Sequence, residues 1–213
     1  MSRVEPILAP LRPWFTTLMH RPLRLIIGAG SFRQEGWLSS DYAEDGQWLP
    51  RPWRLADHIL PLDITKEAHW AALFRPGSIT RMLSEHVFEH LTDADLARGL
   101  ALCRRYLAPR GRLRIAVPDG HRPDARYIDG VAPPADGHLH LFTVESLVAL
   151  IEAAGFQAEP IEHYDATGRF HRRPYDEADG IVLRCYSRDR QADFQFADHF
   201  YTSIIVDAVK GGS

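Results

Sequence analysis

Residues 23–41, LRLIIGAGSFRQEGWLSSD, decide the fold class of this chain of 213 residues. The apolar run of Leu23, Leu25, Ile26 and Ile27 stops abruptly at residues 28–30, Gly-Ala-Gly, which is typical of a buried parallel strand that enters a tight turn. Glycine adopts backbone angles that are closed to other residues and lets a ligand approach the main chain without meeting a Cβ atom. Residues 36–41 then indicate a second short strand that ends on the carboxylate of Asp41. A glycine turn followed by such an acid is suited to the hydroxyl groups of a ribose.

Length and composition favour one globular domain with additions, since 45% of the residues are hydrophobic and can bury a full core. We predict an N-terminal arm over residues 1–22 and one domain over residues 23–213. The net charge is −3, and the basic residues form no block, so no nucleic-acid partner is predicted. Cys103 and Cys185 form no C-x-x-C motif, and no signal peptide or membrane span is visible. We therefore predict a cytoplasmic protein without a membrane partner.

Strand and helix patterns alternate from residue 23 to residue 163, which predicts an α/β sandwich around a mainly parallel sheet. Beyond the first two strands, the predicted strands are residues 56–64, 79–86, 112–117, 156–163, 181–186 and 201–209. The predicted helices are residues 65–74, 93–107 and 143–154, with Thr65, Thr92 and Thr143 as their caps. Residues 120–141 are irregular and carry His121, His138 and His140, so a functional or mobile loop is expected there.

Polar and glycine residues follow the predicted strands at the points where the strands end. In parallel sheets, ligands bind at the carboxyl ends of the strands. The residues at these ends are Gly28 to Gly30, Asp41, Asp63, Ser84 to His86, and Pro118 with Asp119. Their coincidence at one edge predicts a ligand site there.

Five segments, in their order, resemble the class I S-adenosylmethionine-dependent methyltransferases, and in particular a small bacterial group of them. The matching segments are LIIGAG, GWLSSD, SEHVFEHL, YLAPRGRLRIAVPDG and HLFTVESLVALIEAAGF, and the resemblance covers roughly residues 23–163. The resemblance implies a Rossmann-like, mainly parallel sheet flanked by helices, in a methyltransferase-like domain over residues 23–213. It also suggests that residues 201–209 form the antiparallel strand that closes such sheets.

The resemblance also implies a cofactor, S-adenosylmethionine, and a role for each matching residue. Gly28, Ala29 and Gly30 would line its methionine end, and Asp41 would bind the ribose. Asp63 and Ile64 would lie beside the adenine, and Ser84, Glu85 and His86 would flank the sulfonium, where a small-molecule acceptor must enter. The chain departs from the family between the first two strands, where only residues 31–35 replace a full helix. Either that helix is reduced to a turn or the second strand is misplaced.

In methyl transfer the protein mainly has to align the acceptor with the methyl group and exclude water from the pocket, because the sulfonium of the cofactor provides the leaving group. A base is needed only when the acceptor has a proton to lose. The candidates for that base are His86, His138 and His140, since imidazole titrates near neutral pH.

Two other functions fit parts of the sequence. Residues 86–90, HVFEH, match the H-x-x-E-H pattern of a family of zinc peptidases. On a helix, His86 and His90 would share one face and bind Zn²⁺, with Glu89 acting on its water. The third ligand would come from Glu145, Glu152, Glu159 or Glu162. A cofactor-binding domain without catalysis is the remaining alternative, because a retained fold does not prove turnover. The preferred methyltransferase function takes no metal.

Overall fold

The computed structural model describes residues 23–42, 59–188 and 202–212, and the predicted arm over residues 1–22 lies outside them. Within these residues eight strands form one sheet. The strands are β1 (Leu23–Ile27), β2 (Leu38–Asp41), β3 (Ile59–Pro61), β4 (Ile79–Glu85), β5 (Leu107–Val117), β6 (Gln157–Tyr164), β7 (Phe170–Arg172) and β8 (Ile204–Val209).

The sheet has the order β3-β2-β1-β4-β5-β8-β6-β7. Strands β3, β2, β1, β4 and β5 are parallel to one another, whereas β8 is antiparallel to both β5 and β6, and β7 is antiparallel to β6. The α/β class, the mainly parallel sheet and the antiparallel C-terminal strand are therefore confirmed. The predicted strand over residues 181–186 is wrong, because this segment forms bends and a turn.

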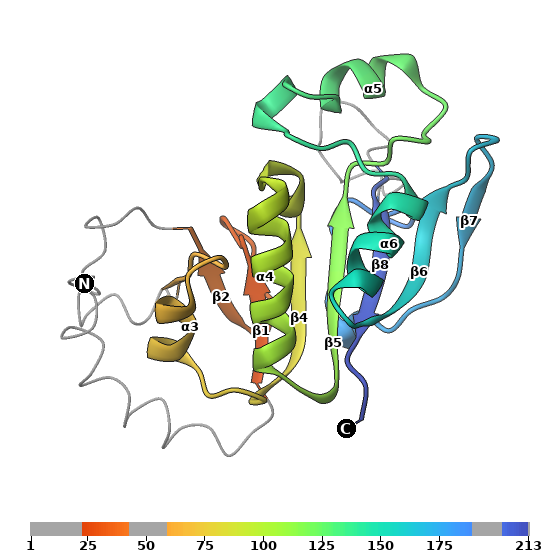
Figure 1. Cartoon of the computed structure of the whole chain (residues 1–213). Helices are drawn as coiled ribbons and strands as arrows, with labels where there is room; N and C mark the ends of the chain where they lie inside the picture. The colour runs from red at the N-terminus through yellow and green to blue at the C-terminus, as the bar shows by residue number, and fades with distance from the viewer. Residues whose placement is uncertain (1–22, 43–58, 189–201, 213) are drawn as a thin grey trace.

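Three of the helices, α3 (Glu67–Leu73), α4 (Asp93–Tyr106) and α6 (Val144–Ala153), lie along one face of the sheet (Figure 1). The predicted caps of the last two are confirmed: the side chain of Thr92 accepts from the backbone amide of Asp95, and that of Thr143 forms a capping box with Ser146. The predicted cap of α3 is wrong. The hydroxyl of Thr65 instead donates to Asp63, 2.7 Å away, and so makes a local turn before the helix begins.

The two faces of the sheet are covered differently. Alternate residues of the strands point to opposite faces, so Leu25 and Ile27 join the larger core under the helices, while Ile26 joins a second, smaller core. Within the described residues, the second core is completed by Val182 and Cys185, which belong to an irregular segment. Bends and turns of the chain therefore cover the face opposite α3, α4 and α6 there.

The connection between β1 and β2 contains no helix, because residues 28–37 form only turns and irregular chain. The second strand is nevertheless placed as predicted at its carboxyl end, with Leu38 paired to Leu25 and Ser39 to Ile26 in parallel register. Of the two expected alternatives, turns in place of a helix are therefore the one that is observed.

Residues 120–141 are more regular than predicted, since they contain α5 (Ala125–Val131) and a short 3-10 helix, η3 (Ala135–Gly137). The carboxylate of Asp124 caps α5 by accepting from the backbone amides of Arg126 and Tyr127. This segment, called the α5–η3 segment below, lies beyond the carboxyl ends of β4 and β5 (Figure 1). Among the described helices, none combines the length and the apolar content needed to cross a membrane.

Candidate functional site

A cavity of about 680 Å³ opens at the carboxyl ends of β1 and β4. Its borders are the glycine turn after β1, the end of β4, part of the α5–η3 segment, and Leu183 with Arg184 from the irregular segment. Its volume falls within the range of roughly 300–1,000 Å³ that is typical of small-molecule sites. The strand-end position predicted for a ligand site therefore coincides with a cavity of suitable size.

The two glycines of the turn have different surroundings. Both have positive φ, +65° at Gly28 and +48° at Gly30, which favours glycine. A Cβ atom on Gly28 would lie 2.3 Å from Cγ2 of Val87, whereas one on Gly30 would meet no atom within 4 Å. Gly28 is therefore needed for packing, and Gly30 leaves open space at the border of the cavity.

Asp41 holds the turn through its side chain. The backbone amide of Gly30 donates to Oδ2 of Asp41 at 3.1 Å, and that of Tyr42 donates to Oδ1 at 2.8 Å. The amide of Ala29 donates to the carbonyl of Ser40 at 2.8 Å, which ties the turn to β2 a second time. A carboxylate has about four lone-pair positions, so Asp41 keeps the capacity to accept further hydrogen bonds.

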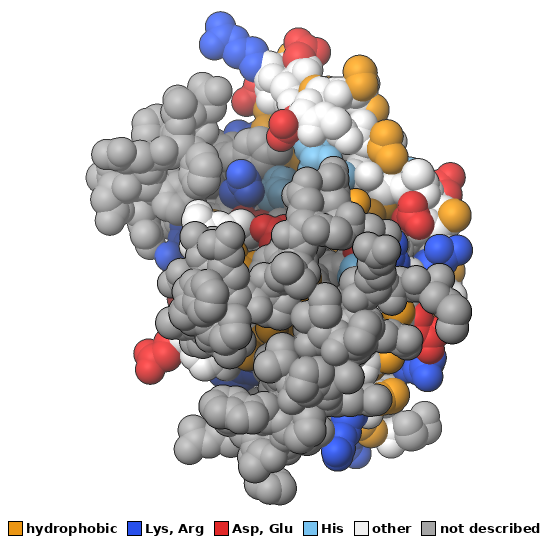
Figure 2. Space-filling model, turned by 90° about the vertical axis from the view of Figure 1, so that its left-hand side faces the viewer, with side chains coloured by type: hydrophobic (Ala, Val, Ile, Leu, Met, Phe, Trp, Pro, Cys, Tyr) orange, Lys and Arg blue, Asp and Glu red, His pale blue; other side chains and the backbone are white. Residues whose placement is uncertain are grey.

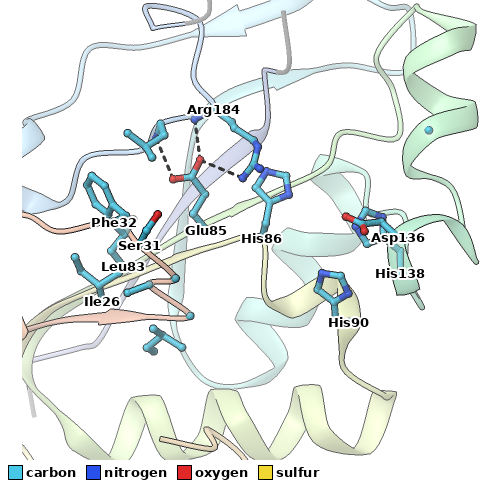
Figure 3. A pocket seen from close by; sticks show the side chains of 16 residues that line it. Ile26, Ser31, Phe32, Leu83, Glu85, His86, His90, Asp136, His138 and Arg184 are labelled. Carbon is cyan, nitrogen blue, oxygen red and sulfur yellow. Dashed lines mark hydrogen bonds and ion pairs between the residues drawn. The ribbon is translucent and has the colours of Figure 1, made fainter. Parts of the chain in front are cut away.

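Glu85, at the end of β4, fastens the opposite wall of the cavity. Its Oε2 accepts from the backbone amide of Leu183 at 2.9 Å, and its Oε1 accepts from that of Arg184 at 2.7 Å (Figure 3). The guanidinium of Arg184 lies 4.0 Å from the same carboxylate. These bonds explain why residues 181–186 form no strand, because amides that a strand would pair with a neighbour are taken by a side chain.

His86 follows directly and has an uncommon backbone conformation for a residue other than glycine, with φ of 55°. Its Nδ1 lies 2.9 Å from Oε1 of Glu89, and its Nε2 lies 3.0 Å from the hydroxyl of Ser203. The imidazole borders the cavity between these two groups. Both ring nitrogens of His86 therefore already contact polar groups of the chain.

The other two histidines predicted as bases have different positions. His138 borders the cavity and is buried, with its Nδ1 2.7 Å from the carbonyl oxygen of Val131. His140 lies outside the cavity lining, where its Nε2 is 3.6 Å from Asp93 and its ring stacks on Phe142. His121 pairs with Glu145 at 2.9 Å. The three histidines of residues 120–141 therefore do not form one cluster.

Asp63, Ile64 and Ser84 also lie outside the lining of this cavity. Burial raises the pKa of Asp63, but hydrogen bonds from Thr65 and the charge of Lys66 outweigh it, so the pKa of this carboxyl is lowered overall. Ser84 is fully buried, and its hydroxyl makes no hydrogen bond within the described residues. Asp119, at the end of β5, is buried and accepts from the amides of His121 and Tyr164, and burial raises its pKa.

The H-x-x-E-H motif does not lie on an α-helix, contrary to the prediction. Residues 86–87 are irregular, and residues 88–90 form a 3-10 helix, η2 (Phe88–His90). One possible ligand atom from each of Glu89, His90 and His138 lies within 4.8 Å of the others, so the cluster includes His138 and not His86. The candidate third ligand Glu145 is paired with His121 instead.

Several residues at the cavity were not predicted for the preferred function. His90 has a predicted role in the zinc motif alone, and no sequence motif includes Asp136, Leu183 or Arg184. In Figure 2, which shows the face at the left-hand side of Figure 1, histidine side chains reach the surface in the upper part of the view, beside acidic and basic side chains. The H-x-x-E-H motif is the sequence feature from which His90 could have been predicted as a residue of this cavity.

The residues present fit S-adenosylmethionine on two counts. The open space over Gly30 leaves room for a ligand against the main chain, and Asp41 stands beside that turn with acceptor capacity left. Ile26, Phe32 and Leu83 supply an apolar wall. Gly28, Ala29, Gly30 and Asp41 would hold this cofactor, which supplies a methyl group on a positively charged sulfur.

Comparison with solved structures shows the fold. A methyltransferase dependent on S-adenosylmethionine from Archaeoglobus fulgidus matches with a TM-score of 0.53 and 16% identity, over 97% of this chain and 94% of that chain. The 1,6-didemethyltoxoflavin-N1-methyltransferase of Burkholderia thailandensis, solved with its substrate and S-adenosylhomocysteine, matches with a TM-score of 0.51 and 15% identity, over 97% and 79%. A possible histamine N-methyltransferase from Thermotoga maritima matches with a TM-score of 0.51 and 13% identity, over 92% and 84%.

The sequence itself matches no protein-family model and no protein of curated function. The structural neighbours thus show that the chain has the Rossmann-like fold of these methyltransferases, while their low identity carries no residue role to this chain.

Proposed function

We propose that this protein binds S-adenosylmethionine and transfers its methyl group to a small molecule. The observation that carries the proposal is the cavity at the carboxyl ends of β1 and β4, which is bordered by the glycine turn that Asp41 holds in place. The fold of the structural neighbours supports it, since these proteins are described as methyltransferases. A small acceptor is favoured because the cavity is bounded by several segments and the Burkholderia neighbour acts on a small molecule.

Each end of the cavity would have its own task. The glycine turn would bind the cofactor, with Gly30 allowing close approach and Asp41 accepting hydrogen bonds from the ribose. The adenine would extend beyond the lining of this cavity toward Asp63 and Ile64. Leu83 and Phe32 would exclude water from the reacting atoms. His86 would orient the acceptor or take its proton, since its imidazole borders the cavity.

Calorimetric titration with S-adenosylhomocysteine tests the proposal without knowledge of the acceptor. We expect saturable binding with one molecule per chain. Gly30→Val offers a matched variant, because a branched side chain would enter the space over the turn, and it should abolish binding while the protein stays folded by circular dichroism. Full affinity in Gly30→Val, or no binding to the unaltered protein, would reject this site.

A further inference from the structure

The strongest feature outside the glycine turn is the cluster of Glu89, His90 and His138, called the histidine cluster below. One ligand atom from each residue lies within 4.8 Å of the other two. Glu89 and His90 come from η2, and His138 follows η3. The backbone carbonyl of Glu89 accepts from the amides of Leu139 and His140, at 2.8 and 3.1 Å. These bonds join the two segments and bring the three side chains close to one another.

Glu89 is fully buried, with 0% of the residue exposed. Neither of its carboxylate oxygens accepts a hydrogen bond from the described residues, although Nδ1 of His86 lies 2.9 Å from Oε1. A buried carboxylate normally requires several hydrogen bonds or a cation, because it has lost its hydration. One imidazole at one oxygen leaves most of that requirement unmet, so a positively charged ligand is expected beside this carboxylate.

The two histidines are oriented as metal ligands are. Nδ1 of His138 lies 2.7 Å from the carbonyl oxygen of Val131, and Nδ1 of His90 lies 3.3 Å from that of Gly137. A carbonyl can only accept, so Nδ1 is the donor in each ring, and Nε2 is the nitrogen through which the neutral ring would bind a metal. A backbone carbonyl on one ring nitrogen, with a metal on the other, is the usual arrangement around protein metal ions.

We propose that Glu89, His90 and His138 form a binding site for a divalent first-row transition metal ion such as Zn²⁺. Two imidazoles and one carboxylate are a ligand set of zinc and of non-haem iron sites that keep open coordination positions. Ligands about 2.1 Å from a tetrahedral ion lie about 3.4 Å apart, so the cluster must contract when it binds. His90 is exposed and can rotate to close that gap.

The open position of the ion would face the cavity, because His90 and His138 both border it. In Figure 3 they lie on the side away from Ser31 and Phe32 of the turn, with Glu85 and His86 between the two groups. The proposed ion is therefore separate from the residues that would hold S-adenosylmethionine. It needs neither the α-helix nor the His86 ligand that the zinc-peptidase motif requires.

Zinc binding by the chelator-treated, full-length protein tests this site. We expect calorimetric titration with ZnCl₂ to show one tight site per chain, and thermal denaturation to shift to higher temperature with zinc, since a ligand of the folded state stabilises it. His90→Ala and His138→Ala should each lower zinc affinity by more than about 100-fold, because even an outer-shell partner is worth about 10–100-fold. His90 is exposed, so His90→Ala should remain folded even if a variant of buried His138 does not.

His121→Asn is the matched control, since His121 pairs with Glu145 outside the cluster, and it should bind zinc as the unaltered protein does. Absence of tight zinc binding, or equal zinc affinity in His90→Ala and the unaltered protein, would overturn the proposal. Titration of the same samples with S-adenosylhomocysteine separates the two proposals. Cofactor binding without zinc rejects only the metal site, and zinc binding without the cofactor rejects only the proposed methyl transfer.

Discussion

The two ends of the cavity are built in different ways. At the glycine turn, the chain satisfies its own polar groups: the amides of Ala29 and Gly30 donate to β2, and Asp41 receives two hydrogen bonds. At the histidine cluster, the carboxylate of Glu89 is buried without an accepted hydrogen bond among the described residues. At the turn, these backbone and side-chain groups are hydrogen-bonded without a ligand. At the cluster, a buried charge can depend on the ligand for its compensation.

Replacement of Gly28 should have the largest effect at the turn. A Cβ atom there would lie 2.3 Å from the branched side chain of Val87, and φ is +65°. Gly28→Ala should lower the free energy of unfolding by about 2–5 kcal/mol, from backbone strain and overpacking together. Gly30→Ala should cost only the strain, about 1–2 kcal/mol, because no atom lies within 4 Å. Urea denaturation measures both values, and equal losses would show that Val87 can move aside.

Asp41→Ala should weaken binding of S-adenosylhomocysteine by about 1.5–3 kcal/mol, through the loss of a charged acceptor beside the turn. The loss would combine a ribose contact with looser order of the turn, since Asp41 also accepts from Gly30. Asp41→Asn separates these contributions, because its amide keeps one acceptor oxygen without the charge. Calorimetry gives the affinities, and an unchanged affinity in Asp41→Ala would show that Asp41 has no part in the cofactor site.

Glu89→Gln should have the opposite sign at the histidine cluster. Removal of a buried charge that accepts no hydrogen bond should raise the free energy of unfolding of the metal-free protein by about 1 kcal/mol. Zinc should then stabilise the unaltered protein more than this variant. A destabilised Glu89→Gln protein would mean that His86, 2.9 Å from Oε1, already compensates the charge. Urea denaturation with and without zinc distinguishes these outcomes.

Asp63→Asn should have the smallest effect and should depend on pH. The folded-state pKa of Asp63 lies below its ordinary value of 3.8, because the bonds from Thr65 and the charge of Lys66 outweigh burial. The carboxylate therefore contributes stability that is present above about pH 3.8 and is lost as the pH falls through the lower folded-state pKa. The variant should be less stable than the original at about pH 7, and the difference should shrink toward pH 3. A constant difference would contradict the lowered pKa.

The fold class could be predicted from the sequence because it depends on local patterns. The apolar run before Gly28 and the spacing of Leu96, Leu100 and Cys103 are each visible within a short window. Apart from the partly buried Leu23, all these residues lie in the two cores. The prediction of a strand over residues 181–186 was wrong because the contacts that decide its conformation are made with residues far away in the sequence. Its apolar residues cover a sheet face, and its amides at Leu183 and Arg184 donate to Glu85, which lies far away in the sequence.

The same distinction holds for the site. The glycine turn and Asp41 belong to neighbouring segments, so their proximity followed from the strand order. The histidine cluster joins η2 to a residue far along the chain through bonds of the backbone at Glu89. The H-x-x-E-H spacing predicts a site that contains Glu89 and His90, but with His86 as the second histidine, because the prediction requires an α-helix. The structure has a 3-10 helix there and brings His138 to the cluster instead. Long-range backbone contacts of this kind leave no periodic pattern in the sequence.

The irregular cover of the second sheet face has a consequence for biosynthesis. Domains fold as the chain leaves the ribosome, N-terminal part first. Strands β1 and β4 are translated early, whereas Val182 and Cys185, which belong to the same second core as Ile26 and Leu83, are translated much later. Until then the apolar side chains of that face lack this cover and can associate with other nascent chains. A chaperone that binds exposed apolar segments would be needed most during that interval. Truncation before residue 181, which removes both this cover and β8, should give an aggregating product.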